Sequence, residues 1–156
     1  MKRFIQFLVY IVVIGLATAC DSNRVFDEYK TIQNGLWHKD SLVVFSVPVT
    51  DTIQNHNLYI NIRNDINYGY SNLWLFIEIV QPKGIAVKDT FEIVLADPTG
   101  QWLGEGMGGL KTRQSVYRRN VYFPNSGDYK ITIQQGMRED ELEGISDVGF
   151  RAEITE

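Results

Sequence analysis

The sequence predicts an all-β protein, a single antiparallel β-sandwich of the immunoglobulin-like or jelly-roll-like kind, behind an N-terminal lipoprotein signal peptide. Two observations predict the sandwich. Apolar residues recur with a period of two in several short segments, as in strands with one buried face and one wet face. Turn-forming residues separate these segments, and no segment has the period of a long amphipathic helix. A third observation, an apolar N-terminus that ends at the only cysteine, predicts the signal peptide.

The first 19 residues have the three parts of a signal peptide. Lys2 and Arg3 form a charged start, residues 4–16 are almost entirely apolar, and residues 17–19 are small. A membrane-spanning helix needs roughly 20 apolar residues, and this run gives way to a polar stretch at Asp21. We therefore expect residues 1–19 to be removed.

Cys20 is the predicted lipidation site, because Ala19-Cys20 resembles the lipobox of bacterial lipoproteins. The usual leucine three residues before the cysteine is replaced by Ala17, with Leu16 one place earlier. The alternative is an ordinary signal peptide with a chance cysteine nearby. Two or more acyl chains would anchor the protein stably in a membrane. Residues 20–34 are then the lipidated cysteine with a tether and edge strand, and residues 35–156 the sandwich domain.

The candidate strands follow one another along the chain: Val43 to Val47, which stops near Pro48, then Leu58–Ile62, Leu73–Val80, Phe91–Leu95, Val116–Phe123, Tyr129–Ile133 and Val148–Ile154. Leu73–Val80 is apolar on both faces apart from Glu78, which predicts a central strand covered on both sides. Gly127-Asp128-Tyr129 predicts either a tyrosine corner or an ordinary strand tyrosine. Met137–Leu142, which ends near Gly144, predicts a brief glycine-capped helix between the last two strands.

Composition argues against several classes of function. Without Lys2 and Arg3 the mature chain has 13 basic and 19 acidic residues, and this acidic balance disfavours nucleic-acid binding. Nucleophilic catalysis needs a base beside serine or cysteine, yet the only histidines, His38 and His56, lie in polar surroundings that predict solvated side chains. No spacing of metal ligands is present in the sequence, and nothing predicts a cofactor.

The remaining chemical motifs have structural explanations. The glycine-rich segment 100–109 lies between strands instead of opening a helix, so it predicts a loop, not a phosphate site. Trp102 in that loop either packs over the core or forms a binding edge. The acidic residues 139–143 are explained by a solvated turn better than by acid–base catalysis. Isolated charges at Arg63, Arg138 and Asp147 predict structural ion pairs or backbone hydrogen bonds.

The mature chain also resembles the gliding-motility lipoprotein GldH family of the Bacteroidetes over nearly its whole length. The residues that carry the resemblance are the lipoprotein cysteine, Trp37, Tyr70 with Asn72-Leu73, Asp89-Thr90, Gly100-Gln101-Trp102-Leu103-Gly104, Gly127-x-Tyr129 and a closing segment, Met137-Arg138-x-x-x-Leu142-x-Gly144-Ile145-x-Asp147-Val148-Gly149. The closing segment is the most specific part, because a generic sandwich does not require its spacing. The resemblance implies a role in gliding motility or associated envelope machinery, in gliding or non-gliding species, and implies no enzymatic activity.

These observations predict a non-catalytic protein that is attached to a membrane by its lipid and that contacts other envelope or motility proteins. The predicted contact residues are Met137, Arg138, Glu141, Leu142, Asp147 and Trp102. The alternative for the closing segment is that it caps the sandwich, with Leu142 buried and Arg138 bonded to carbonyl groups. The alternative function is a glycan-binding module with exposed aromatic residues. We expect the protein in the cell envelope, on the periplasmic side of the inner or outer membrane or at the cell surface.

Two short motifs predict a possible modification of the mature chain. Asp40-Ser41-Leu42 and Asp51-Thr52-Ile53 resemble the Asp-Ser/Thr-aliphatic acceptor of O-glycosylation in exported Bacteroidetes proteins. The motif is short, and an unmodified turn beside a strand explains Ser41 and Thr52 equally well.

Overall fold

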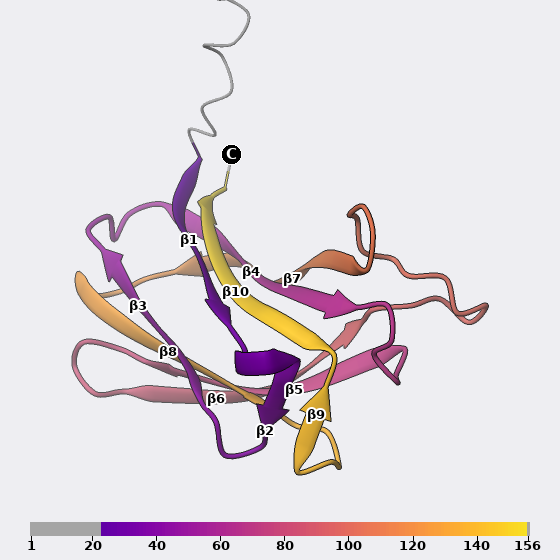
Figure 1. The fold of residues 1–156 in the computed structure, drawn as a ribbon. Helices are drawn as coiled ribbons and strands as arrows, with labels where there is room; N and C mark the ends of the chain where they lie inside the picture. Colours follow the sequence, from indigo (N-terminus) through magenta and orange to yellow (C-terminus); the bar gives the residue numbers. More distant parts are fainter. Residues whose placement is uncertain (1–22, 156) are drawn as a thin grey trace, which may run out of the picture.

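A computed structural model describes residues 23–155, which form a sandwich of β-sheets (Figure 1). Within this range there are ten strands and one 3-10 helix and no α-helix. Their bounds are β1 Arg24–Thr31, η1 Gln33–Gly35, β2 Leu36–His38, β3 Val43–Val49, β4 Asn55–Asp65, β5 Asn72–Val80, β6 Ala86–Val94, β7 Leu110–Tyr122, β8 Gly127–Gln135, β9 Glu141–Glu143 and β10 Ile145–Ile154. No helix within residues 23–155 is long and apolar enough to cross a membrane.

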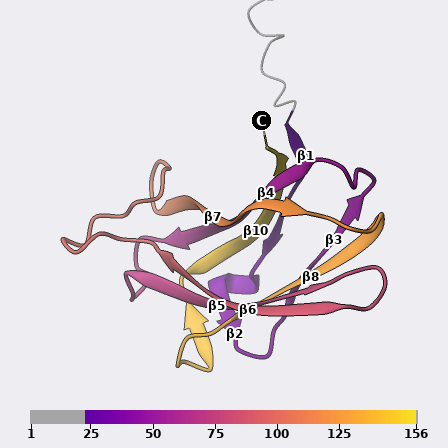
Figure 2. The same cartoon turned by 180° about the vertical axis from the view of Figure 1, so that it is seen from behind.

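Two four-stranded antiparallel sheets face each other across the core. One has the strand order β1-β10-β4-β7 and the other β3-β8-β5-β6, and Figure 2 shows the same two layers from behind. β1 pairs with β10 along its whole length, so the sandwich begins at residue 24 and the edge strand expected before residue 34 belongs to it. Pro48 lies in β3, an edge strand, where its missing N–H removes no hydrogen bond from the interior of the sheet.

A small third sheet joins β2 to β9 at the end of the molecule opposite the start of β1 (Figure 1). Trp37 of β2 is opposite Leu142 of β9, and both side chains are buried. The prediction of a brief helix over Met137–Leu142 is therefore wrong. Residues 137–140 form a loop and 141–143 a strand, because pairing with β2 takes the backbone groups that a helix would use. Gly144 has a φ of 89°, which glycine adopts without strain, and turns the chain into β10.

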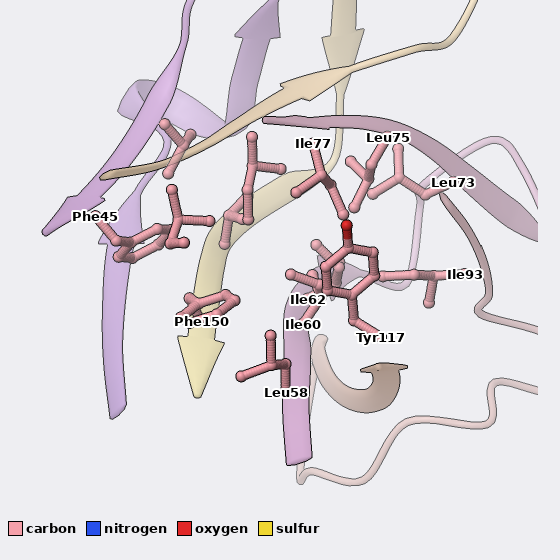
Figure 3. Close-up of a cluster of buried hydrophobic side chains, with 14 of the residues drawn as sticks. Phe45, Leu58, Ile60, Ile62, Leu73, Leu75, Ile77, Ile93, Tyr117 and Phe150 are labelled. Carbon is pink, nitrogen blue, oxygen red and sulfur yellow. The ribbon is translucent and has the colours of Figure 1, made fainter. Parts of the chain in front are cut away.

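The core is built from the inward residues of both large sheets. Phe45, Leu58, Ile62, Leu75 and Phe150 point toward one another in Figure 3, and all five are buried. The period-two pattern predicted this, since alternate residues of β3, β4 and β8 are buried. The antiparallel sandwich predicted from the sequence is confirmed.

Tyr129 forms the predicted tyrosine corner. Its ring is buried, and its hydroxyl donates to the Asn125 carbonyl oxygen at 3.0 Å and accepts from the Asn125 N–H at 3.3 Å. The hydroxyl thereby ties the loop before β8 to the core.

Replacing Tyr129 with phenylalanine keeps the buried ring and removes only the hydroxyl. We expect Tyr129→Phe to lower the free energy of unfolding by about 1 kcal/mol, because the two Asn125 backbone groups lose a partner. Urea denaturation measures the change. An unchanged midpoint would show that these two hydrogen bonds do not stabilise the fold.

His56 is buried, so the prediction of a solvated histidine is wrong for this residue. It lies in β4 on the inward face with Leu58, and its ring is 5.1 Å from that of Phe123, measured between centroids. Its Nδ1 makes no hydrogen bond within the described part of the chain. Burial lowers the pKa of His56 below its ordinary value of 6.5.

This lowered pKa predicts a loss of stability in mild acid. Above pH 6.5 the imidazole is neutral in both states, and the stability is fully present. As the pH falls below 6.5, the unfolded state takes up the proton first, and the free energy of unfolding decreases. Protonation of carboxylates also lowers the free energy of unfolding, but only near their own ordinary pKa values of about 4. The free energy of unfolding of His56→Gln should therefore depend less on pH between 6.5 and 5 than that of the wild-type protein. Equal pH dependence of the two proteins would contradict the lowered pKa of His56.

Candidate contact surface

The outer face of β5 carries exposed aromatic side chains. Trp74 is 40% exposed and Phe76 is 49% exposed, while their neighbours Leu73, Leu75 and Ile77 are buried. The prediction that this strand is covered on both sides is therefore wrong. β5 is an interior strand of its sheet, yet no element of the described chain covers its outer face. An apolar strand with an open face is typical of a binding surface.

The loop that follows β8 lies directly beside these aromatic residues. The Gly136 N–H donates to the Trp74 carbonyl oxygen at 2.7 Å, and the Trp74 N–H donates to Met137 Sδ at 3.4 Å. A Cβ atom at Gly136 would lie 3.2 Å from the Phe76 ring. Glycine at this position therefore lets the loop approach β5 closely.

Gln135 holds this loop in place from the core side. Its side chain is buried, its Oε1 accepts from the Met137 N–H at 2.8 Å, and its Nε2 donates to the Glu139 carbonyl oxygen at 2.8 Å. The sequence analysis did not identify this residue. The period of two through Tyr129, Ile131 and Ile133 continues to Gln135 and could have identified it as the inward residue, and its register position opposite Leu75 agrees.

Two shallow grooves lie on this side of the molecule. One, of about 370 Å³, lies between Tyr70, Trp74 and the loop residues Met137, Arg138 and Glu139. The other, of about 640 Å³, runs past Phe76 and is lined also by polar side chains, among them Glu78, Thr90, Thr132 and Gln134. We name Tyr70, Trp74, Phe76, Met137 and Arg138 the distal surface.

Hydrogen bonds fix the rim of the distal surface. The Tyr70 hydroxyl donates to the Glu139 carboxylate, and this bond raises the pKa of Tyr70. Lys39 donates to Asp140 at 2.7 Å and holds the pKa of that carboxyl below its usual range. Arg138 is exposed and makes no ion pair within residues 23–155. It therefore offers an unpaired cation beside an aromatic groove.

The structure divides the predicted contact residues into two groups. Arg138 and Glu141 are exposed, and Met137 is half-buried against the core. Leu142 and Asp147 are buried. Trp102 is half-buried against the core, with its ring centroid 6.5 Å from that of Tyr68. Its packing over the core, one of the two expectations for this residue, is confirmed.

Asp147 belongs to a polar chain across the first large sheet. Its carboxylate accepts from Arg63 at 3.0 Å and from the Thr31 hydroxyl at 2.8 Å, and Arg63 also donates to the Thr112 hydroxyl at 3.3 Å. These residues lie on β1, β10, β4 and β7, in the order of the strands. Arg63 and Asp147 therefore form a structural ion pair, which is one of the two outcomes predicted for these isolated charges.

Close packing explains why position 149 of the closing segment is a glycine. A Cβ atom there would lie 3.0 Å from the Tyr29 ring and 3.0 Å from the Asn61 side chain. The Tyr29 ring packs directly over the backbone of β10, and it also lies 5.3 Å from the Arg63 guanidinium. The spacing of Asp147 and Gly149 therefore serves packing in the sheet.

The other predicted sites are Cys20, Ser41 and Thr52. Cys20 is outside the described residues. Ser41 is exposed in the turn before β3, and Thr52 is half-exposed in the turn before β4. Neither residue lines the grooves beside Trp74 and Phe76.

Comparison with known proteins identifies the family. A profile described as GldH lipoprotein matches residues 24–152. A curated protein of Christiangramia forsetii named gliding motility lipoprotein GldH homolog is 45% identical over 160 residues, and the match covers 98% of both chains. Gliding motility lipoprotein GldH of Flavobacterium johnsoniae is 42% identical over 145 residues, with 88% of this chain and 89% of that protein covered.

Solved structures are less similar. A structure of the infectious bursal disease virus Gx strain has a TM-score of 0.39 and 16% identity, and covers 86% of this chain and 33% of that chain. The family profile and the two curated relatives, by contrast, extend over most of the chain. This chain belongs to the GldH lipoprotein family.

Proposed function

We propose that this membrane-anchored envelope lipoprotein supports gliding motility, or the envelope machinery associated with it, by binding other proteins through its distal surface. The names of the two curated relatives support the link to motility. The single observation that supports a contact role is the open apolar face of β5, where Trp74 and Phe76 lie exposed beside the 136–140 loop.

The composition of the distal surface suits a protein partner. Protein interfaces are enriched in tryptophan, tyrosine, methionine and arginine, and their energetic centre is usually an aromatic anchor in a pocket. Trp74, Tyr70 and Met137 supply that centre, and Arg138 and the acidic residues of the loop supply a polar rim. His56 is buried against Phe123 and His38 lies beside Asp40, and neither lines the two grooves.

Replacing Arg138 and Glu141 with alanine tests the proposal. Both side chains are exposed, so Arg138→Ala with Glu141→Ala should leave the melting temperature unchanged. The same variant should lose most of its bound partner in affinity purification and should fail to restore gliding to a deletion strain. Lys83→Ala with Asp128→Ala is the matched control, because it also removes one exposed cation, in the turn before β6, and one exposed anion, at the start of β8, both away from the loop. A folded double variant that keeps its partners and supports gliding would contradict the proposal.

Glycan binding is the second candidate, and the groove past Phe76 favours it. There an exposed ring lies among hydroxyl, amide and carboxylate groups of Thr90, Gln134 and Glu78, which is the mixture that sugar rings need for stacking and hydrogen bonding. Phe76→Ala should then abolish retention of the protein on envelope polysaccharide. If the polysaccharide retains the wild-type protein and Phe76→Ala equally, or retains neither, binding to a protein partner is the better explanation.

A further inference from the structure

We propose that the end of the sandwich where β1 begins lies against the lipid bilayer, and that Ile53 and Tyr122 contact its headgroup region. This inference rests on the predicted anchor at Cys20 and is independent of the proposed protein partner. Only three residues separate Cys20 from Arg24, the first residue of β1, so the two lie four steps apart along the chain. Such a segment spans at most about 14 Å even when fully extended. The start of β1 is therefore held close to the membrane surface.

Four strand ends meet at this place. The Ile154 N–H of β10 donates to the Asn23 carbonyl oxygen at 2.8 Å, and the Thr155 N–H donates to the Asn55 carbonyl oxygen at 2.8 Å. Asn55 begins β4 and is paired with Tyr122, the last residue of β7. Figure 1 shows the start of β1 and the C-terminus side by side at the top. We call this group of strand ends the N-terminal end.

The N-terminal end displays apolar side chains to solvent. Ile53 is 87% exposed, Tyr122 is 56% exposed, and Val25 is also exposed. The Asp51 carboxylate accepts from the Ile53 N–H at 2.7 Å and from the Gln54 N–H at 3.2 Å, so an ordered turn presents the isoleucine. Single exposed apolar residues are common on soluble proteins. Here they cluster within a few strand spacings of the start of β1, where the predicted anchor attaches, and this position points to lipid as the partner.

The chemistry of these side chains suits a bilayer surface. Tyrosine is enriched at membrane interfaces, because its ring is apolar and its hydroxyl stays hydrated. An isoleucine beside it gains free energy on leaving water. Because the acyl chains already hold the protein, the contact has to orient the domain and does not have to supply the affinity. The distal surface, on the outer face of the other large sheet, then faces away from the membrane.

β4 offers a matched pair of positions for the test. Ile53 lies just before this strand and Ile66 just after it, and both isoleucines are exposed, at 87% and 47%. The strand between them has 11 residues and is about 33 Å long. Ile53→Cys and Ile66→Cys, made separately in the full chain, each introduce one reactive thiol, because the thiol of Cys20 is occupied by lipid.

Each lipidated variant is labelled with an environment-sensitive fluorophore. It is then reconstituted into phosphatidylethanolamine and phosphatidylglycerol vesicles that contain a nitroxide-labelled lipid. The label at position 53 should lose most of its fluorescence, and the label at position 66 should keep nearly all of it. Equal quenching at both positions, quenching at 66 alone, or none at 53 would overturn the proposal. Failure of the protein to stay with the vesicles would also overturn it, because the anchor on which it rests would be absent.

Discussion

Replacing Cys20 with alanine is expected to move the protein completely from the membrane fraction to the soluble fraction. Each buried acyl methylene contributes about 0.8 kcal/mol to membrane binding, so two or more chains make the attachment effectively irreversible and their loss abolishes it. The apolar run of residues 4–16 is too short to span a bilayer as a helix and does not replace the lipid. The measurement is fractionation of envelopes followed by intact-mass analysis.

The matched control for this experiment is Ala17→Leu. It restores the usual lipobox leucine three residues before Cys20 and should stay entirely in the membrane fraction. The Cys20→Ala variant should remain folded, because the described sandwich begins only at residue 24. A mature wild-type chain whose mass includes no acyl group would refute the anchor, as would membrane retention of Cys20→Ala.

Replacing Trp37 with alanine is expected to cost about 3–5 kcal/mol of the free energy of unfolding, the range for large aromatic side chains in cores. Trp37 is completely buried, and its Nε1 donates to the Ser41 carbonyl oxygen at 2.8 Å. A domain of this kind has a total stability of about 5–15 kcal/mol, so the variant should lie near the limit of folding. Urea denaturation measures the loss.

Trp37→Phe separates the two contributions of this side chain. It keeps most of the buried ring and removes the hydrogen bond to Ser41, so it should cost clearly less than Trp37→Ala. A loss below about 1 kcal/mol for the alanine variant would show that β2 and β9 do not close the core. Because Trp37 is opposite Leu142 in this small sheet, its loss should also loosen the loop of the distal surface.

The sequence predicted the architecture well because most strands have one buried face. In β3 and β8, alternate apolar residues were sufficient to identify the inward side, and they are buried in the structure. The tyrosine corner was one of two expectations for Tyr129, and an ion pair was one of two expectations for the isolated charges Arg63 and Asp147; the sequence did not show that these two charges pair with each other.

The incorrect predictions share a physical cause. Residues 73–80 are apolar on both faces, and the sequence does not show that one face lacks a covering element. His56 lies between two asparagines that occupy the opposite face of β4, so its polar neighbours concealed its burial. The loop at 137–140 depends on Gln135 and on pairing between β2 and β9, which are about 100 residues apart. Such long-range contacts leave no local pattern.

The candidate site was therefore predicted only in part. The closing segment was identified through its family resemblance, but the structure assigns Leu142 and Asp147 to packing and leaves Arg138 and Glu141 exposed. Its aromatic counterpart, Trp74 with Tyr70, comes from a different strand and loop. Only the paired β5 and β8 bring the two together, through the hydrogen bonds between Trp74 and residues 136–137.

Site-specific photocrosslinking in living cells tests the central claim, contact through the distal surface, most directly. A benzophenone amino acid replaces Tyr70 or Trp74, and the matched control replaces Tyr122, another exposed aromatic residue at the N-terminal end. Positions 70 and 74 should each form a discrete covalent adduct with the same envelope protein on irradiation, and position 122 should form none with protein. Absence of any protein adduct at positions 70 and 74, or an adduct at position 122 alone, would contradict the account.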